Sequence, residues 1–247
     1  MRRIKLVIAY DGTNYCGWQL QPGKPTVEAE LNRALSELLR EAVTVTGASR
    51  TDSGVHALGN VAVFDTESRI PAEKISYAVN QRLPEDIRVQ SSYEAAPDFH
   101  PRKTVSRKTY EYRILNRKIA LPTERLYATH IYYDLDVIRM QEAAEYLVGE
   151  HDFKSFCSVK TQALDTVRTI YQLTVTKEED IIRIRVTGSG FLYNMVRIIA
   201  GTLMEIGRGA YPPERIREIL KGCDRSLAGP TALPQGLKLL EIDYSPQ

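Results

Sequence analysis

One segment of the chain gathers side chains that could carry out nucleophilic or acid–base chemistry. It spans residues 47–57 and reads GASRTDSGVHA, with Asp52 at its centre two positions after Arg50. A guanidinium so close keeps an aspartate ionised even in a partly dry pocket. The ionised carboxylate is also the form that acts as a nucleophile. Because the neighbouring residues are small, a ligand can approach the backbone closely. The segment therefore predicts a catalytic carboxylate on a loop.

The same residues also allow a purely structural interpretation. Thr-Asp-Ser-Gly is ordinary turn chemistry, because Asp caps its own turn and Gly relieves strain. His56 is then a hydrogen-bonded loop residue rather than a base. A serine hydrolase is disfavoured, since Thr51 occupies the place of the second glycine of a nucleophile elbow. Spacing alone leaves the catalytic and the structural interpretation open.

Metal and dinucleotide chemistry are not expected. The three cysteines, Cys16, Cys157 and Cys223, are widely spaced, and none of the four histidines forms a helical metal-binding pair. Gly188-Ser189-Gly190 is followed by Tyr193 where a dinucleotide loop would need its third glycine. The sequence therefore predicts an activity without a cofactor.

A basic segment indicates a nucleic-acid partner. Residues 101–118 hold seven basic residues and one acid, Glu111, with Tyr110 and Tyr112 interleaved. The basic residues are Arg102, Lys103, Arg107, Lys108, Arg113, Arg117 and Lys118. A basic strand that carries aromatics is typical of an RNA-binding surface, while a solvated strand face is the alternative. Tyr110 by itself could equally be a strand aromatic that packs on the core.

An otherwise apolar segment near the end of the chain contains one arginine. Arg197 follows Phe191 and Met195 and precedes Ile198. An arginine in such a setting needs a partner. A buried structural salt bridge and a catalytic role are both open, and Asp52 would satisfy either one.

Hydrophobic periodicity predicts the elements that position these residues. In the first half we expect strands at 4–10, 43–46, 61–64 and 87–89, with helices from Thr26 to Arg40 and from 71 to 83. In the second half we expect strands at 104–115, 167–176, 181–186 and 237–244, with helices at 135–147, 191–206 and 212–220. Each half reads β-α-β-β-α-β, apart from one added helix.

This order predicts an α+β protein made of two ferredoxin-like split βαβ halves, residues 1–100 and 101–247. We expect their sheets to join into one mixed sheet with a central RNA-binding cleft. The chain has 247 residues, 43% hydrophobic and 26% charged, and no apolar run approaches the roughly 20 residues that span a bilayer. A cytoplasmic protein without a membrane partner is therefore expected.

The motif around Asp52 resembles the signature of the tRNA pseudouridine synthase A family, and the resemblance extends over almost the whole chain. Besides residues 50–57 (RTDSGVHA), it involves segments that occur in the family's order. They are 10–13 (YDGT) with 17–19 (GWQ), 99–102 (FHPR), 107–112 (RKTYEY), 151–156 (HDFKSF), 190–197 (GFLYNMVR) and 236–244. Two features depart from the family's pattern. Thr129 stands where many members have tryptophan, and Ala232-Leu233-Pro234 replaces the more usual Ala-Pro order.

The resemblance implies two ferredoxin-like halves and a homodimer that binds tRNA across both subunits. It implies that Asp52 is the catalytic aspartate, that Tyr110 stacks on the target base, and that Arg50 and Arg197 bracket the carboxylate. Arg102, Arg107 and Lys108 are the expected RNA contacts. The implied activity isomerises uridine to pseudouridine in the anticodon stem-loop, at tRNA positions 38, 39 and 40.

Two other functions remain possible at this stage. A non-catalytic RNA-binding module on the same fold would explain the basic strand, although no aromatic-rich strand motif of the RNA-recognition type is present. A glycosidase acting on a nucleoside would need a second catalytic carboxylate, and Glu111 is expected on the strand face opposite Tyr110. The sequence also leaves open whether Asp52 attacks C1′, attacks C6 or removes a proton from C2′.

Overall fold

The computed structural model describes residues 1–158 and 165–244. They belong to two compact units. Unit 1 comprises Met1–Ser106 and the chain from Leu239 onward, and unit 2 comprises Arg107–Lys238. Among the described residues, no helix combines the length and the apolar character needed to cross a membrane.

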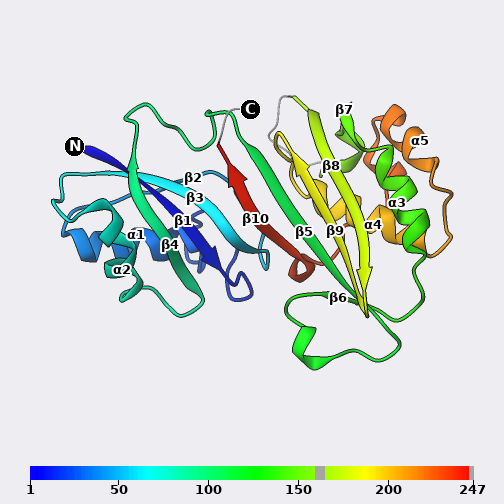
Figure 1. Cartoon of the computed structure of the whole chain (residues 1–247), viewed down its shortest axis with the longest axis horizontal. Helices are drawn as coiled ribbons and strands as arrows, with labels where there is room; N and C mark the ends of the chain where they lie inside the picture. Colours follow the sequence, from blue (N-terminus) through cyan, green and yellow to red (C-terminus); the bar gives the residue numbers. More distant parts are fainter. Residues whose placement is uncertain (159–164, 245–247) are drawn as a thin grey trace. The chain divides into compact units, whose positions relative to one another are not determined.

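Unit 1 is an antiparallel sheet with two helices (Figure 1). Its strands are β1 (Arg2–Tyr10), β2 (Thr46–Gly47), β3 (His56–Thr66) and β4 (Ile87–Ala95), and its helices are α1 (Val27–Leu39) and α2 (Ala72–Asn80). The strands run in the order β4-β1-β3, and β2 pairs with β3. The last strand, β10 (Leu237–Asp243), follows β3 in this order and begins with two residues of unit 2.

Alternation along β1 builds the core of unit 1. Ile4, Leu6 and Ile8 are fully buried, while the residues between them are only half-buried. A strand with period-2 burial has one face packed against the helices. The predicted N-cap of α1 is confirmed, since the Thr26 hydroxyl accepts a hydrogen bond from the Ala29 N–H at 3.4 Å.

Unit 2 repeats this plan with additional short elements. Its strands are β5 (Arg107–Asn116), β6 (Thr129–Ile131), β7 (Gly149–Asp152), β8 (Val167–Glu178) and β9 (Ile181–Gly188). Its helices are α3 (Val137–Glu145), α4 (Met195–Gly207) and α5 (Arg215–Gly222). The order β5-β9-β8-β7 is antiparallel, and β6 pairs with β5 in parallel.

The predicted fold class is confirmed: the protein is α+β, with ferredoxin-like element order in both halves and a mixed sheet. Several predicted boundaries differ from the observed ones. The strand predicted at 61–64 is longer and runs over His56–Thr66. Two further boundaries are wrong for a local reason. The strand predicted at 43–46 is only Thr46–Gly47, because α1 side chains bind the N–H groups of Val43 and Val45 at 3.0 and 2.8 Å. The helix predicted from residue 191 begins at Met195, because Asn194 adopts a left-handed conformation with φ 62°.

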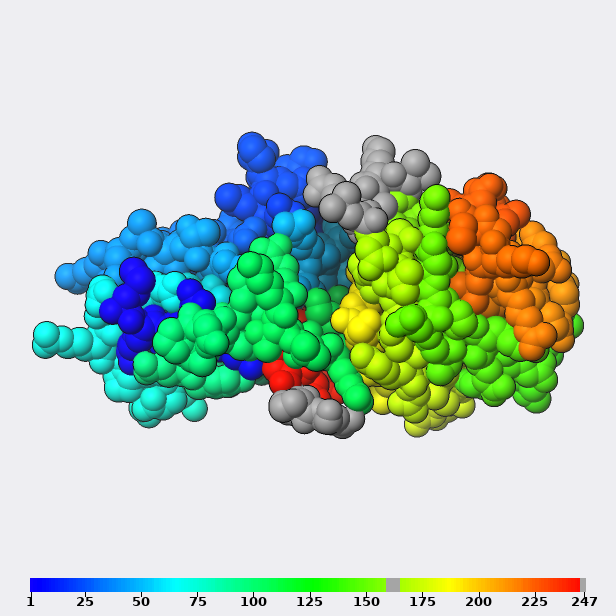
Figure 2. Space-filling model, turned by 90° about the horizontal axis from the view of Figure 1, so that it is seen from above, coloured from blue at the N-terminus to red at the C-terminus, as the bar shows by residue number. Residues whose placement is uncertain are grey.

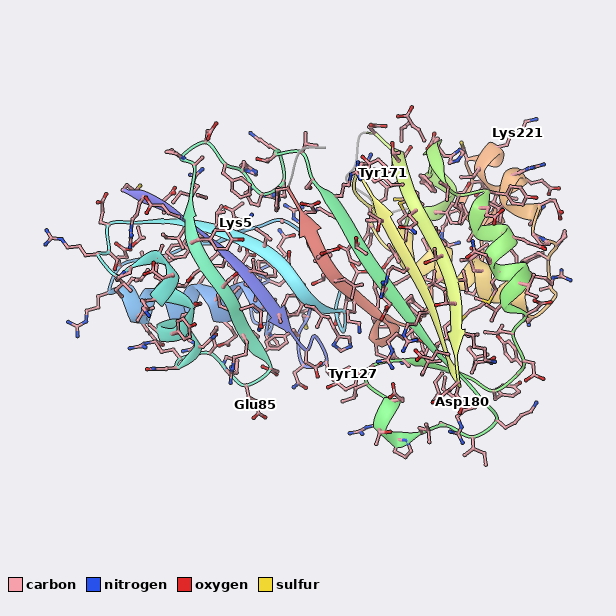
Figure 3. All side chains as sticks on the ribbon, in the orientation of Figure 1. Lys5, Glu85, Tyr127, Tyr171, Asp180 and Lys221 are labelled. Atoms are coloured by element: carbon pink, nitrogen blue, oxygen red, sulfur yellow. The ribbon has the colours of Figure 1, made fainter. Side chains whose placement is uncertain are left out.

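The connector at residues 96–106 is docked onto unit 1. The Tyr244 hydroxyl donates to the Pro101 carbonyl at 2.7 Å, and the rings of Phe99 and Tyr244 meet edge to face at 5.0 Å. The Lys5 ammonium, labelled in Figure 3, lies 4.5 Å from the Tyr244 ring centroid and 5.0 Å from that of Phe99. Figure 2 shows the connector, in green, beside the red residues of β10. The connector is therefore an ordered part of unit 1.

Candidate active site

Asp52 stands on a loop that combines buried residues with more exposed ones. Residues 48–55 connect β2 to β3, and Ala48, Thr51 and Val55 are buried. Asp52 is half-buried, whereas Arg50 is exposed. The loop therefore anchors itself with small and apolar residues and leaves its charged groups accessible.

The loop between β1 and α1 holds this turn by its backbone. The Trp18 N–H donates to the Thr51 carbonyl at 3.1 Å. The Tyr15 carbonyl accepts from the Gly54 N–H at 3.3 Å and from the Ser53 hydroxyl at 3.2 Å. Residues immediately before and after Asp52 are thus fixed to one neighbouring segment, which restricts the movement of its Cα.

The turn itself is closed by backbone geometry. The Val55 N–H donates to the Asp52 carbonyl at 3.1 Å, and Gly54 has φ +76°. Glycine adopts this left-handed conformation without steric cost. A Cβ on Gly12, in the neighbouring loop, would lie 2.0 Å from the Val55 carbonyl oxygen. The close approach of the two loops requires glycine there.

Asn60 supports the loop from the other side, although no motif or spacing in the sequence marks it. It is fully buried on β3, and its amide exchanges hydrogen bonds with Ser49, donating to the Ser49 carbonyl at 3.0 Å and accepting from its N–H at 3.3 Å. The Asn60 amide also donates to the Tyr10 hydroxyl at 3.3 Å, and that hydroxyl lies 2.7 Å from the Thr51 hydroxyl. A buried polar network of this kind specifies one loop conformation.

His56 serves the loop structurally. It is 5% exposed, its Nδ1 accepts from the Gly12 N–H at 3.1 Å, and an Asp11 carboxylate oxygen lies 3.1 Å from the same nitrogen. These contacts tie the start of β3 to the end of β1. They match the interpretation of His56 as a hydrogen-bonded residue, although it begins β3 instead of lying in the loop.

Arg50 forms no ion pair or hydrogen bond within the described part of the chain. Its guanidinium is exposed beside the Asp52 turn. Within the described part of the chain, Arg50 therefore forms no ion pair with Asp52.

Tyr110 lies on β5 in unit 2, opposite Val186 of β9. It is 8% exposed and meets Phe191 edge to face, with ring centroids 5.2 Å apart. Its neighbour on the same strand face, Tyr112, is fully buried, and burial raises the pKa of Tyr112 to about 12. The Tyr112 hydroxyl lies 2.5 Å from that of Thr129, one of the positions at which this chain departs from the family that it resembles. The strand under Tyr110 is thus firmly packed.

Arg197 lies in the first turn of α4 and is held by its own unit. Its Nε donates to the Ala232 carbonyl and one Nη to the Asn194 side chain, both at 2.8 Å. The Ala232 N–H donates back to the Arg197 carbonyl at 3.1 Å. These two hydrogen bonds and the returning one from Ala232 orient the guanidinium within unit 2.

The expected RNA contacts differ in their surroundings. Arg102 is exposed on the docked connector, and Lys108 is half-buried on β5. The Arg107 guanidinium lies 4.6 Å from the ring centroid of Tyr171, an exposed residue of β8 labelled in Figure 3. A guanidinium on an aromatic face keeps its full charge.

Two other arginines of the basic segment are neutralised by acids from elsewhere in unit 2. Arg113 pairs with Glu124 at 3.2 Å, and Arg117 pairs with Asp180 at 3.1 Å. Two of the seven positive charges of this segment are therefore compensated by carboxylates.

Comparisons with known proteins identify the same kind of protein over most of the chain. Residues 6–102 and 143–245 match the family described as tRNA pseudouridine synthase. Proteins called tRNA pseudouridine synthase A are similar over nearly their whole length. The one from Thermoanaerobacter sp. (strain X514) is 49% identical over 99% of this chain and 100% of its own. The one from Ruminiclostridium cellulolyticum is 50% identical with the same coverage, and the one from Bacillus subtilis (strain 168) is 47% identical over 98% of this chain and 99% of its own.

Proposed function

The chain belongs to the tRNA pseudouridine synthase family, and from this premise we propose that it isomerises uridine to pseudouridine in tRNA with Asp52 as the catalytic carboxylate. The reaction breaks the N1–C1′ bond of the nucleotide, joins C1′ to C5, and moves a proton from C5 to solvent while N1 gains one. Substrate and product contain the same atoms, so the balance requires no oxidant, reductant or group donor. The proposed targets are uridines 38, 39 and 40 of the anticodon stem-loop.

The observation that carries the proposal is the form of the Asp52 turn. A half-buried carboxylate stands on a backbone whose residues on both sides are hydrogen-bonded to the β1–α1 loop. A group held in this way reaches its target without a further ordering step, which favours catalysis by positioning. Attack on C1′, attack on C6 and removal of the C2′ proton are all compatible with such a carboxylate.

We assign the other roles in the reaction to Tyr110, Arg50 and Arg197. The target nucleotide leaves its stack at a cost of a few kcal/mol, and stacking on Tyr110 returns ~1–3 kcal/mol. Tyr110 is also our candidate for removal of the C5 proton. The exposed Arg50 binds the backbone of the extruded nucleotide, and Arg197 stabilises the negative charge of Asp52.

The rest of the RNA is bound by charge. We assign phosphate contacts to Arg102, Arg107 and Lys108, supported by the exposure of Arg102 and by the aromatic rather than acidic partner of Arg107. The resemblance to the family further implies a homodimer, and the sequence predicts a cytoplasmic protein; we include both in the proposal. A non-catalytic RNA-binding module is disfavoured by the family to which the chain belongs.

The test is Asp52→Asn, measured with tRNA transcripts that contain C5-tritiated uridine. The wild type releases tritium and forms pseudouridine at the proposed positions, whereas the variant binds tRNA but releases none. Asp65→Asn is the matched control, because Asp65 is a carboxylate of the same unit that pairs with Arg3 at 2.8 Å and lies near the end of β3 that is opposite to the loop. Undiminished turnover in Asp52→Asn would discard the mechanism, and free uracil as product would indicate a glycosidase.

A further inference from the structure

We propose that Asp86 is a positioning residue for the reaction: it fixes Tyr15, and the Tyr15 carbonyl in turn holds the turn that carries Asp52. Asp86 lies directly before β4, and it belongs to none of the segments that resemble the family signature. The inference rests on the proposed function, since it concerns the placement of the carboxylate assigned to catalysis there.

The connection begins with hydrogen bonds between Asp86 and the β1–α1 loop. The Tyr15 phenol donates to one carboxylate oxygen of Asp86 at 2.6 Å, and the Asn14 amide donates to the other at 3.3 Å. The Asp86 carbonyl accepts from the Asp11 N–H at 2.9 Å. One residue therefore binds the beginning and the middle of this loop, by its backbone and by both of its carboxylate oxygens.

The second step runs from Tyr15 to the catalytic turn. Its carbonyl oxygen accepts two hydrogen bonds, from the Gly54 N–H at 3.3 Å and the Ser53 hydroxyl at 3.2 Å. These are the two residues that follow Asp52, and both lone pairs of the carbonyl are used. The side chain and the carbonyl share one Cα, so loss of the phenol contact removes a restraint on the backbone that carries this carbonyl.

The third step is the lack of free space around this connection. Tyr15 is 7% exposed, and the backbones of Gly12 and Val55 are in direct contact, as the 2.0 Å approach of a hypothetical Gly12 Cβ indicates. Close-packed surroundings transmit a displacement instead of absorbing it. Burial, followed by the hydrogen bond to Asp86, raises the pKa of Tyr15, so that the phenol remains a donor throughout the neutral range.

The alternative is that the Asp86–Tyr15 pair contributes only to stability. The two roles differ in what they do to kinetics. A positioning residue lowers kcat and leaves the KM for tRNA almost unchanged, because binding of the RNA does not depend on where the carboxylate points. A residue that only stabilises the fold lowers the melting temperature and leaves kcat of the folded enzyme intact.

The experiment measures kcat, KM and thermal unfolding of the full chain with tritiated tRNA. We expect Asp86→Ala and Tyr15→Phe each to lower kcat by about ten- to a hundredfold, the loss associated with a displacement approaching 1 Å, with KM within twofold of wild type. The double variant should be no slower than the slower single variant, because both changes break one contact. Asp86→Asn should regain most of kcat, since its amide oxygen still accepts from the phenol.

Asp65→Ala is the matched control. It removes the Asp65–Arg3 pair, in which two guanidinium nitrogens each lie 2.8 Å from a carboxylate oxygen, from the same unit. It should change stability but leave kcat at the wild-type value.

The inference is overturned if Asp86→Ala keeps the wild-type kcat, or if its KM rises in proportion to the loss in kcat. It is also overturned if Asp65→Ala loses as much kcat as Asp86→Ala. If Asp86→Ala does not fold, the comparison of Tyr15→Phe with Asp86→Asn decides by the same criteria. Failure of the proposed function is seen separately, as a wild-type enzyme that releases no tritium.

Discussion

Replacing Gly17 with alanine should displace the turn that carries Asp52 while leaving most of the protein folded. Gly17 has φ +88°, and a Cβ at this position would lie 2.5 Å from the Thr51 carbonyl oxygen and 3.1 Å from the Asp52 carbonyl carbon. The left-handed conformation costs an L residue about 1–2 kcal/mol. The contact with Thr51 is roughly 1 Å shorter than ordinary van der Waals distance, so the turn must move by a large fraction of that amount.

A displacement of this size near the reacting groups lowers the rate by about a hundredfold. We therefore expect Gly17→Ala to lose about two orders of magnitude in kcat, with tRNA affinity close to that of wild type. Single-turnover tritium release gives the rate of the chemical step, and filter binding gives the affinity. Urea unfolding of the same preparation gives the loss of stability, which should be about 1–3 kcal/mol.

Gly23→Ala separates strain from displacement. Gly23 belongs to the same β1–α1 loop and has φ +70°, but no heavy atom of the described residues lies within 4 Å of its hypothetical Cβ. This variant should lose about 1–2 kcal/mol of stability through backbone strain alone and keep wild-type kcat. Equal rates for Gly17→Ala and Gly23→Ala would refute the argument that the β1–α1 loop determines where Asp52 stands.

Two further predictions concern unit 2. Arg107→Gln should weaken tRNA binding and reduce the slope of log Kd against log salt by roughly 0.7–0.9, the contribution of one phosphate contact. Arg117→Gln should change the slope less, because a carboxylate already neutralises the charge of Arg117. Equal slopes for the two variants would show that Arg107 does not belong to the RNA-binding surface. Burial by itself would raise the pKa of Glu111, but the Arg185 hydrogen bond and the Lys238 charge outweigh it and lower the pKa below its ordinary 4.5. The ionised Glu111 therefore stabilises the fold above about pH 4.5, and this contribution is lost as the pH falls through the lowered pKa of the folded state. Glu111→Gln should lower the free energy of unfolding at pH 7, and the difference from wild type should disappear in acid. Urea unfolding at several pH values measures both.

The order of elements was predictable because it rests on local signals. The alternating apolar residues of β1 and the hydroxyl of Thr26 before an amphipathic segment have the same meaning in any fold. The motif around Asp52 predicted a loop for the same reason, since Gly54 and its small neighbours specify a turn. These features depend on residues only a few positions apart.

What the sequence did not predict depends on residues that are distant along the chain. Asn60 interrupts an apolar strand and carries no signal of its own, yet it fixes Ser49 from the opposite side of the loop. Glu124 and Asp180 neutralise arginines of β5 only because the fold brings them there. Asp86 is the clearest case, since its partner Tyr15 lies 71 positions earlier.

A loop is usually the most mobile part of a fold, and a mobile carboxylate would have to be ordered each time a substrate binds. In this chain the ordering is completed during folding, because hydrogen bonds fix Thr51, Ser53 and Gly54 before any RNA is present. A preorganised group loses little entropy in the reaction, so its placement affects the chemical step more than binding. Changes in the β1–α1 loop should therefore act on kcat, whereas changes in the basic residues of β5 should act on affinity.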